Sequence, residues 1–333
     1  MPQLFDYIAW RGDLPLSQVP LNPVDNLILS CLSYIHFEEF LPSHRVGPVS
    51  IAQASRYFME IPSKEREALM RTKRDEELLN QLALTERFGC LRLENPTGHT
   101  DPVLEKQFAA VTVLLGDGGA YVAFRGTDST LVGWKEDFNM AFLPVIPSQA
   151  DAADYVTKLG EGFPGKLLLM GHSKGGNLAA YAGMFCDPEI QKRIERVYPL
   201  DSPGFIGNTL KSEEYGRIQS RIHKVIPKGS LIGMLLENHG AYSVVESNQM
   251  GIMQHDPFSW QVTDGAFHTL EEISSGAKYM NKTLNSWITG MSIDERIRLV
   301  DVLYGLLTAG NIENVFDASD IQKNIGAIYN AAV

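Results

Sequence analysis

The chain has 333 residues, of which 44% are hydrophobic and 21% charged, as is typical of a globular protein with a sizeable core. Its formal net charge of −11 at pH 7 argues against nucleic acid or an anionic membrane surface as a partner. The sequence holds no run of about 18 uncharged apolar residues, so no membrane-spanning segment is expected. Its three widely spaced cysteines and the lack of an apolar signal segment predict a cytoplasmic protein.

The first predicted elements are helices. Residues 22–35 begin with Asn22, a good N-cap, and Pro23, which fits a first helical turn, and their apolar residues then recur at helical spacing. A second helical region with mixed charges covers residues 63–84. Near the other end, "SIDERIRLVDVLYGLLTAG" predicts a helix that starts with a capping box and ends near Gly310.

The middle of the chain has the pattern of an α/β protein. Two β-type runs flank "GDGG", residues 116–119, which predicts a hairpin. Short apolar strands then alternate with helices, which predicts βαβ units and a mostly parallel central sheet with helices on both faces. We expect one domain over residues 1–333, with a core at about 107–268 and extra helical flanks at about 22–85 and 269–330.

The pentapeptide Gly171-His172-Ser173-Lys174-Gly175 matches the pattern G-x-S-x-G. The strand "KLLLM" precedes it and the helix "NLAAYAG" follows, as a nucleophile elbow requires, so Ser173 is the candidate nucleophile. The backbone N–H of Lys174, at the helix N-terminus, would stabilise a developing oxyanion without needing the lysine side chain. His172 is expected to be a satisfied turn residue, and the alternative for Ser173 is an idle serine in a buried turn.

A second motif, "YVAFRGTDSTLVGWKEDF", begins about fifty residues before the pentapeptide. With "GHSKGG", it resembles class 3 (fungal-type) lipases of the α/β-hydrolase superfamily over roughly residues 107–255. The resemblance implies an α/β-hydrolase fold in which Thr127 supplies the other oxyanion donor, while Trp134 and Asp137 hold the oxyanion loop. Arg125 and Asp137 are expected to form a structural ion pair. The whole chain, including "FDYIAWRGDLPLSQ" and "QHDPFSW", is similar to a bacterial family of lipase-like proteins.

The candidate base is a histidine downstream of the serine, since α/β-hydrolases place the triad in the order serine, acid, histidine. His255 lies in a loop after a predicted strand, and it also matches the lipase family's late histidine. His239 and His268 are the alternatives, whereas His223 comes too early in the chain.

The candidate acid departs from the lipase pattern. The family position after the strand "HKVIP" is occupied here by Lys228, Gly229 and Ser230, none of which is a carboxylate. Asp201, after the previous strand, is the favoured acid, and the alternative is that it only forms a turn. Glu246 is a lesser candidate, and Asp256 adjoins the histidine that it would have to orient.

These residues predict a serine hydrolase that cleaves a small-molecule or lipid carboxylic ester through an acyl-serine intermediate. Neither a metal nor an organic cofactor is expected. A thioesterase or peptidase is the alternative within the enzymes, and a catalytically silent binding or regulatory protein is the alternative outside them. Residues 203–220 or the helical flanks are candidates for a lid, and the sequence leaves the substrate and the oligomeric state open.

Overall fold

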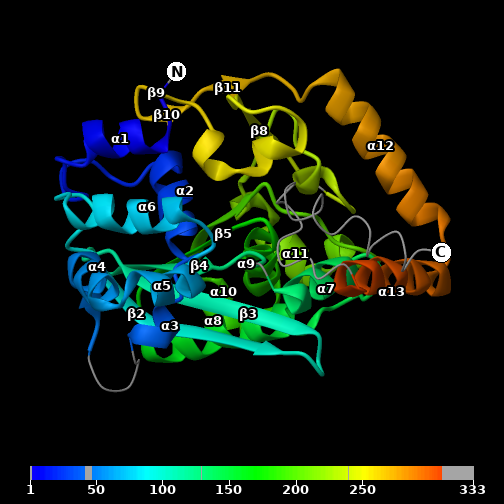
Figure 1. Ribbon diagram of the computed structural model, residues 1–333, viewed down its shortest axis with the longest axis horizontal. Coiled ribbons are helices and arrows are strands. Elements are labelled where there is room, and N and C mark those ends of the chain that lie inside the picture. Colours follow the sequence, from blue (N-terminus) through cyan, green and yellow to red (C-terminus); the bar gives the residue numbers. More distant parts are fainter. Residues whose placement is uncertain (1, 42–46, 129, 239, 310–333) are drawn as a thin grey trace.

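The computed structural model describes residues 2–41, 47–128, 130–238 and 240–309. A nine-stranded sheet runs through the centre, in the order β1-β2-β3-β4-β5-β6-β7-β8-β11 (Figure 1). Its strands are β1 Val49–Ser50, β2 Arg92–Asp101, β3 Lys106–Leu114, β4 Gly119–Phe124, β5 Lys166–His172, β6 Ile194–Leu200, β7 Lys224–Pro227, β8 Tyr242–Val245 and β11 Thr269–Leu270. A separate two-stranded sheet pairs β9 Val262–Thr263 with β10 Ala266–Phe267.

The sheet is mixed. Strands β4 to β8 run parallel to one another. At one edge β1, β2, β3 and β4 pair antiparallel in that order, and at the other edge β11 pairs antiparallel with β8. The structure confirms the α/β class, and the parallel arrangement applies to the five central strands. It also confirms the hairpin, because β3 and β4 are joined through Gly116 and Gly118, which have φ values of +82° and +87°.

Thirteen α-helices lie within the described ranges. They are α1 Leu4–Arg11, α2 Pro23–Leu32, α3 Phe37–Phe40, α4 Ile51–Glu60, α5 Ser63–Arg66, α6 Lys73–Ala83, α7 Leu131–Asn139, α8 Pro147–Gly162, α9 Lys174–Phe185, α10 Pro188–Gln191, α11 Glu213–Ile218, α12 Ser275–Gly290 and α13 Ile293–Ala309. Short 3₁₀ helices are η1 Glu67–Leu69, η2 Thr209–Lys211, η3 Gln219–Arg221, η4 Ile232–Met234, η5 Gly251–His255 and η6 Pro257–Ser259.

Helix starts agree with the capping signals better than helix lengths do. The Asn22 side chain accepts hydrogen bonds from two N–H groups of α2, as predicted, but the helix ends at Leu32. The predicted helix over residues 63–84 is wrong as one unit, since extended backbone at Met70 and Thr72 separates α5 and η1 from α6. The capping box at Ser292 is confirmed, whereas the predicted end at Gly310 lies outside the described residues.

Both faces of the sheet are covered. Side chains alternate along each strand, so Tyr121 and Met170 join a core with α1, α2 and α6, while Val122 and Leu169 join a second core with α8 and α9. The N-terminal helices are therefore part of the same packing as the central strands. The division of the whole chain into domains stays a prediction. The lid also stays a prediction; of its candidate segments, residues 203–220 contain η2 and α11. Among the described residues, no helix combines the length and apolarity needed to cross a bilayer.

Candidate active site

A sharp turn between β5 and α9 presents Ser173. The serine has φ +60° and ψ −132°, a conformation that non-glycine residues rarely adopt and that costs backbone strain. Close packing around the turn requires glycine, because a Cβ on Gly171 would lie 2.1 Å from the carbonyl carbon of Gly175. A Cβ on Gly175 would lie 2.2 Å from the carbonyl oxygen of Phe124. The pentapeptide therefore has the strand-turn-helix geometry of a nucleophile elbow.

The structure brings together the three side chains that the sequence singles out. His255 Nε2 lies 3.0 Å from Ser173 Oγ, and His255 Nδ1 lies 2.6 Å from Asp201 Oδ2. A carboxylate oxygen only accepts, so Nδ1 carries the proton and Nε2 is free to accept from the serine hydroxyl. Asp201 follows the last residue of β6 and is fully buried, while the His255 side chain keeps 14% of its surface exposed at the end of η5.

The carboxylate of Asp201 is held on its other side. Its Oδ1 accepts from Ser230 Oγ at 2.5 Å and from the Gly233 N–H at 3.1 Å. Ser230 stands in the loop after β7, where lipases of the resembling type place the acid. In this chain that position therefore donates a hydrogen bond to an acid that comes from the neighbouring strand.

His172 lies against the back of the candidate base. Its Nε2 is 2.8 Å from the backbone oxygen of His255, its Nδ1 is 2.9 Å from the Tyr34 hydroxyl, and the two imidazole centroids are 4.5 Å apart. Burial, together with the charges of His255 and Arg71, lowers the pKa of His172 well below its usual value. The ring is thus neutral, with Nε2–H donating to the carbonyl and Nδ1 accepting from Tyr34. The predicted satisfied turn residue is confirmed, and its partner is the segment that carries the base.

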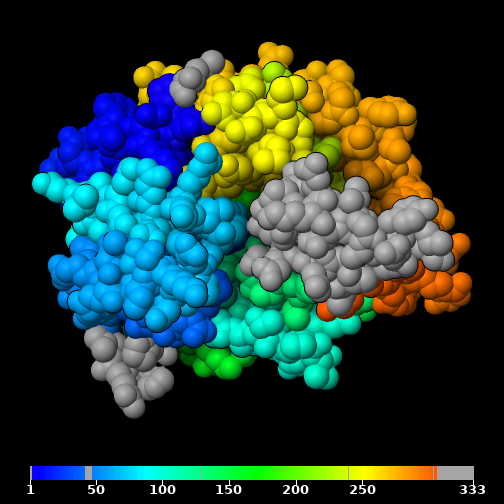
Figure 2. Space-filling model, viewed as in Figure 1, coloured from blue at the N-terminus to red at the C-terminus, as the bar shows by residue number. Residues whose placement is uncertain are grey.

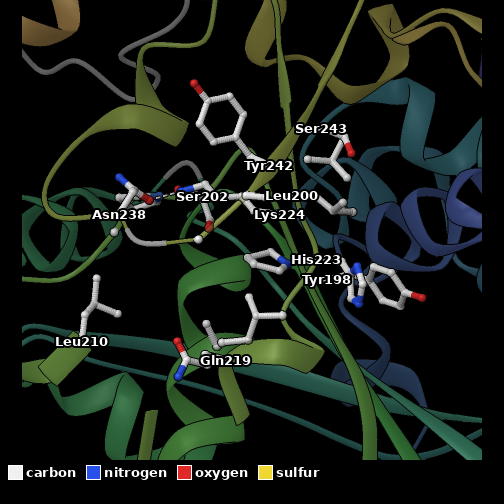
Figure 3. A pocket seen from close by; sticks show the side chains of 18 of the residues that line it. Tyr198, Leu200, Ser202, Leu210, Gln219, His223, Lys224, Asn238, Tyr242 and Ser243 are labelled. Carbon is white, nitrogen blue, oxygen red and sulfur yellow. Dashed lines mark hydrogen bonds between the residues drawn. The ribbon is translucent and has the colours of Figure 1, made fainter. Parts of the chain in front are cut away.

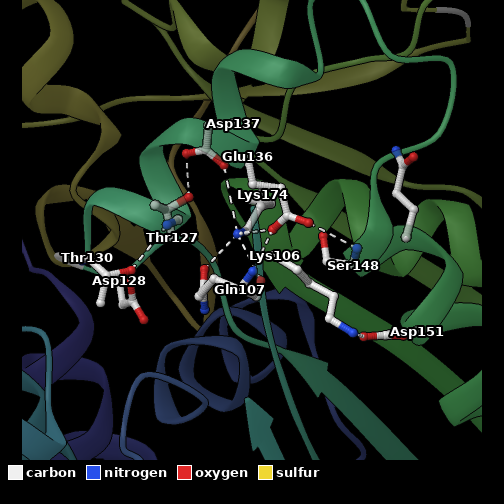
Figure 4. A network of polar contacts seen from close by, with 12 residues as sticks. Lys106, Gln107, Thr127, Asp128, Thr130, Glu136, Asp137, Ser148, Asp151 and Lys174 are labelled. Atoms are coloured by element: carbon white, nitrogen blue, oxygen red, sulfur yellow. Dashed lines mark hydrogen bonds and ion pairs between the residues drawn. The ribbon is translucent and has the colours of Figure 1, made fainter. Parts of the chain in front are cut away.

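The two candidate oxyanion residues meet one polar network (Figure 4). Thr127 Oγ1 donates to Asp137 Oδ2 at 2.5 Å, and Asp137 Oδ1 lies 4.0 Å from Lys174 Nζ. Lys174 Nζ also pairs with Glu136 Oε2 at 2.9 Å and donates to Gln107 Oε1 at 2.6 Å. The network therefore links the Thr127 side chain, in the loop after β4, to the Lys174 side chain at the start of α9.

Residues 82–305, about two thirds of the chain, match the Mbeg1-like family. The chain belongs to the Mbeg1-like family. The match confirms the relationship with lipase-like proteins that the motifs around Ser173 indicate. A comparison of this Mbeg1-like chain with curated proteins gives no match.

Several solved lipase structures are similar to the Mbeg1-like chain at low sequence identity. The lipase from Rhizopus microsporus var. chinensis is 15% identical, with 80% of this chain and 90% of that chain covered and a TM-score of 0.40. Lipase II from Rhizopus niveus is 13% identical, with 75% and 86% covered and a TM-score of 0.40. The Rhizomucor miehei lipase propeptide complex is 15% identical, with 57% and 65% covered and a TM-score of 0.37, so the match spans just under two thirds of that chain.

The alternative acids and bases of the Mbeg1-like chain are not part of the contact between Ser173, His255 and Asp201. Asp256 pairs with Arg74 at 2.7 Å, and Glu246 lies 3.3 Å from Lys228, so neither orients the His255 ring. His268 lies between β10 and β11, and its backbone N–H donates to Gln261. His239 lies outside the described residues.

The predicted ion pair between Arg125 and Asp137 is wrong. Arg125 pairs with both carboxylate oxygens of Glu38, at 2.7 and 2.8 Å, and donates to the backbone oxygens of Ser33 and Ile35. The arginine thus ties the N-terminal helices to the strand that leads into the Thr127 loop.

Burial raises the pKa of Asp137 to about 6, while the charge of Lys174 and the hydrogen bond from Thr127 lower it.

The role of the Lys174 side chain does not follow from the sequence of the Mbeg1-like chain. It is 1% exposed and its partner Glu136, fully buried, also accepts from the Ser148 N–H at 3.0 Å. Replacing Lys174 by methionine leaves a buried carboxylate without its cation, so we expect the free energy of unfolding to fall by about 3–5 kcal/mol. Chemical denaturation measures the change.

The matched control is Lys158→Met. Lys158 pairs with Asp154 at 2.6 Å, but both side chains are more than half exposed, so this change is expected to leave the free energy of unfolding nearly unchanged. Equal losses in the two variants would show that the Lys174–Glu136 pair does not hold the elbow.

Proposed function

We propose that this protein is a serine hydrolase that cleaves a carboxylic ester through an acyl-serine intermediate. The observation that carries the proposal is the continuous contact from Ser173 Oγ to His255 and on to Asp201, at 3.0 and 2.6 Å. A serine hydroxyl needs a base within hydrogen-bond reach, and the base needs a third group that fixes its tautomer. The α/β-hydrolase fold, a single domain and a cytoplasmic location are parts of the same proposal.

The proposed reaction follows from the positions of these groups. Ser173 Oγ attacks the ester carbonyl carbon and gives its proton to His255 Nε2. The N–H groups of Thr127 and Lys174 stabilise the oxyanion, and the His255 proton passes to the leaving alkoxide as the carbon–oxygen bond breaks. Water then gives a proton to His255 and attacks the acyl carbon; the bond from that carbon to Ser173 Oγ breaks, the His255 proton returns to Oγ, and the carboxylic acid leaves. Asp201 keeps Nδ1 protonated and offsets the charge of the imidazolium throughout.

The surroundings of His255 favour an ester with an apolar part. Met250, just before η5, and Met253, within it, are 84% and 53% exposed. Both lie within five residues of the histidine in the sequence. Exposed apolar side chains in the segment that carries the base support a site that receives an apolar group. The acyl or alcohol portion of the proposed substrate is therefore apolar.

The experiment that tests the proposed function is a substrate series on the wild-type protein. p-Nitrophenyl esters of increasing acyl length are compared with a matched thioester and a matched anilide. We expect saturable ester hydrolysis, with slower or undetectable release from the anilide. Ester hydrolysis no faster than in buffer, by protein whose folding is verified by circular dichroism, would contradict the proposal and favour a binding or regulatory role.

Tyr34 is proposed to position the base through His172. Changing Tyr34 to phenylalanine removes the hydroxyl that donates to His172 Nδ1 at 2.9 Å and leaves a buried acceptor unsatisfied, a cost of about 1–3 kcal/mol. Because His172 in turn holds the backbone of His255, we expect kcat to fall about tenfold with KM little changed, for a loss near 1.4 kcal/mol in the transition state. Steady-state kinetics on one p-nitrophenyl ester measures both constants.

The control for Tyr34 is Tyr121→Phe. Tyr121 is also buried and donates to Asn26, at a distance from the site. Both variants should lose stability, whereas only Tyr34→Phe should lose kcat. Equal kcat values in the two variants would reduce Tyr34 to a purely structural residue.

A further inference from the structure

A cavity lies beside strands β6, β7 and β8, and none of the three candidate triad side chains lines it. Its volume is about 700 Å³, within the range of sites that hold small organic molecules. Figure 3 shows the side chains that line it, among them Tyr198 on β6, Leu210 on η2 and Tyr242 on β8. Most of the exposed lining is apolar, so an apolar body would be well accommodated there.

One cation lines this cavity without an anionic partner. Lys224, the first residue of β7, donates from Nζ to the backbone oxygen of Ser202 at 2.7 Å and to the Asn238 side-chain oxygen. Both acceptors are neutral. In the described part of the chain, no carboxylate oxygen lies within 4.0 Å of Lys224 Nζ, and the third N–H of the ammonium has no assigned acceptor.

The charged neighbours do not neutralise this lysine. Asp201 is the charge that favours its ammonium form, but both Asp201 oxygens are already engaged by other donors. Glu237 lines the cavity as an exposed residue, and burial together with Arg196 lowers the pKa of His223, so that ring is neutral. Burial lowers the pKa of Lys224 to about 7. A cation that lacks a counter-ion is costly to desolvate, and an anion entering the cavity would remove that cost.

We propose that this cavity is a second ligand site that takes an organic carboxylate with an apolar body. The carboxylate would accept the third N–H of Lys224 and form a charge-assisted hydrogen bond, while the apolar body would lie among Phe205, Leu210 and Tyr242. The Ser202 oxygen held by Lys224 belongs to the residue after Asp201, so ligand in this site contacts the segment that carries the acid of the candidate triad. The site does not require the proposed hydrolysis.

The test is competitive lysine labelling of the wild-type protein. Acetic anhydride at limiting amounts near pH 7.5 labels free amines, and peptide mass spectrometry reports each lysine separately. With 4-phenylbutyrate present at saturation, labelling of Lys224 is expected to slow by about tenfold or more, as a charge-assisted hydrogen bond predicts. Exposed Lys211 is the internal control and should not change. The neutral isostere 4-phenylbutyramide should protect Lys224 less than about twofold.

Variants complete the test. Calorimetric titration with 4-phenylbutyrate should give a Kd at least about tenfold weaker for Lys224→Met than for wild type, and an unchanged Kd for Lys211→Met. Because the labelling uses wild-type protein, the proposal stays testable even if Lys224→Met folds poorly. Absence of protection, equal protection by the amide, or an unchanged Kd in folded Lys224→Met would each overturn the second site. None of these results depends on Ser173, so this site and the proposed hydrolase activity fail or stand separately.

Discussion

Replacing Ser173 by alanine is expected to lower kcat for ester hydrolysis by about 10⁶-fold, as loss of a serine nucleophile does elsewhere. The hydroxyl is the only part of the side chain lost, so His255 keeps its bond to Asp201 and the fold is preserved. Alanine also lacks the group that becomes acylated, so no covalent intermediate forms. Initial rates with a p-nitrophenyl ester, measured with enough protein to detect residual turnover, give the ratio.

The matched control for this change is Ser286→Ala. Ser286 is exposed on α12, where alanine is well tolerated by a helix. We expect its kcat to equal that of wild type. A Ser173→Ala protein that retains more than a small fraction of wild-type kcat would mean that the ester is cleaved by another group.

Asp201→Asn is expected to lower kcat by about 10⁴-fold while leaving the geometry intact. Two donors, the Ser230 hydroxyl and the Gly233 N–H, point at the Oδ1 position, so the asparagine oxygen will occupy it. The amide NH₂ then faces His255 Nδ1, which must accept. The imidazole proton moves to Nε2, where it blocks transfer of a proton from Ser173. The base is thus present but in the wrong tautomer.

The neighbouring carboxylate offers the control. Asp256 adjoins His255 in the sequence, yet its carboxylate pairs with exposed Arg74. Asp256→Asn is therefore expected to change kcat by less than about threefold, since exposed ion pairs contribute less than about 1 kcal/mol. A larger loss of kcat in Asp256→Asn than in Asp201→Asn would show that Asp201 is not the acid of the triad.

The candidate triad could be predicted because each member sits in a recognisable local pattern. The glycines around Ser173 are needed at one turn, and the strand and helix that flank them are short-range features of the sequence. Asp201 directly follows β6, and His255 ends η5 in the segment after β8, where polar residues stand out from apolar runs. The order of the three residues along the chain then restricts the choice further.

Support of the site by distant residues could not be predicted. Tyr34 meets His172 across 138 positions, Lys174 meets Gln107 across 67, and Arg125 pairs with Glu38 across 87. No periodicity links such pairs, because they meet only when the N-terminal helices, or α9 in the case of Lys174, pack on the sheet. The wrong pairing of Arg125 with Asp137 has the same origin.

The role of Ser230 could not be predicted for a different reason. The sequence shows that a carboxylate is missing from the loop after β7, and by itself that absence favours an inactive site. Only the structure places its hydroxyl 2.5 Å from the Asp201 carboxylate that arrives from β6. The same loop thus contributes a donor to the site instead of the acid.

We propose Ser173 as a nucleophile that His255 and Asp201 activate. The most direct measurement is the position and rate of covalent labelling by a fluorophosphonate, read by peptide mass spectrometry. We expect one adduct, on Ser173, that forms at least about 10³-fold more slowly in Asp201→Asn, because the labelling reaction needs the same deprotonation by His255. Folded wild-type protein that gains no adduct, or gains it on another residue, would show that Ser173 is not an activated nucleophile.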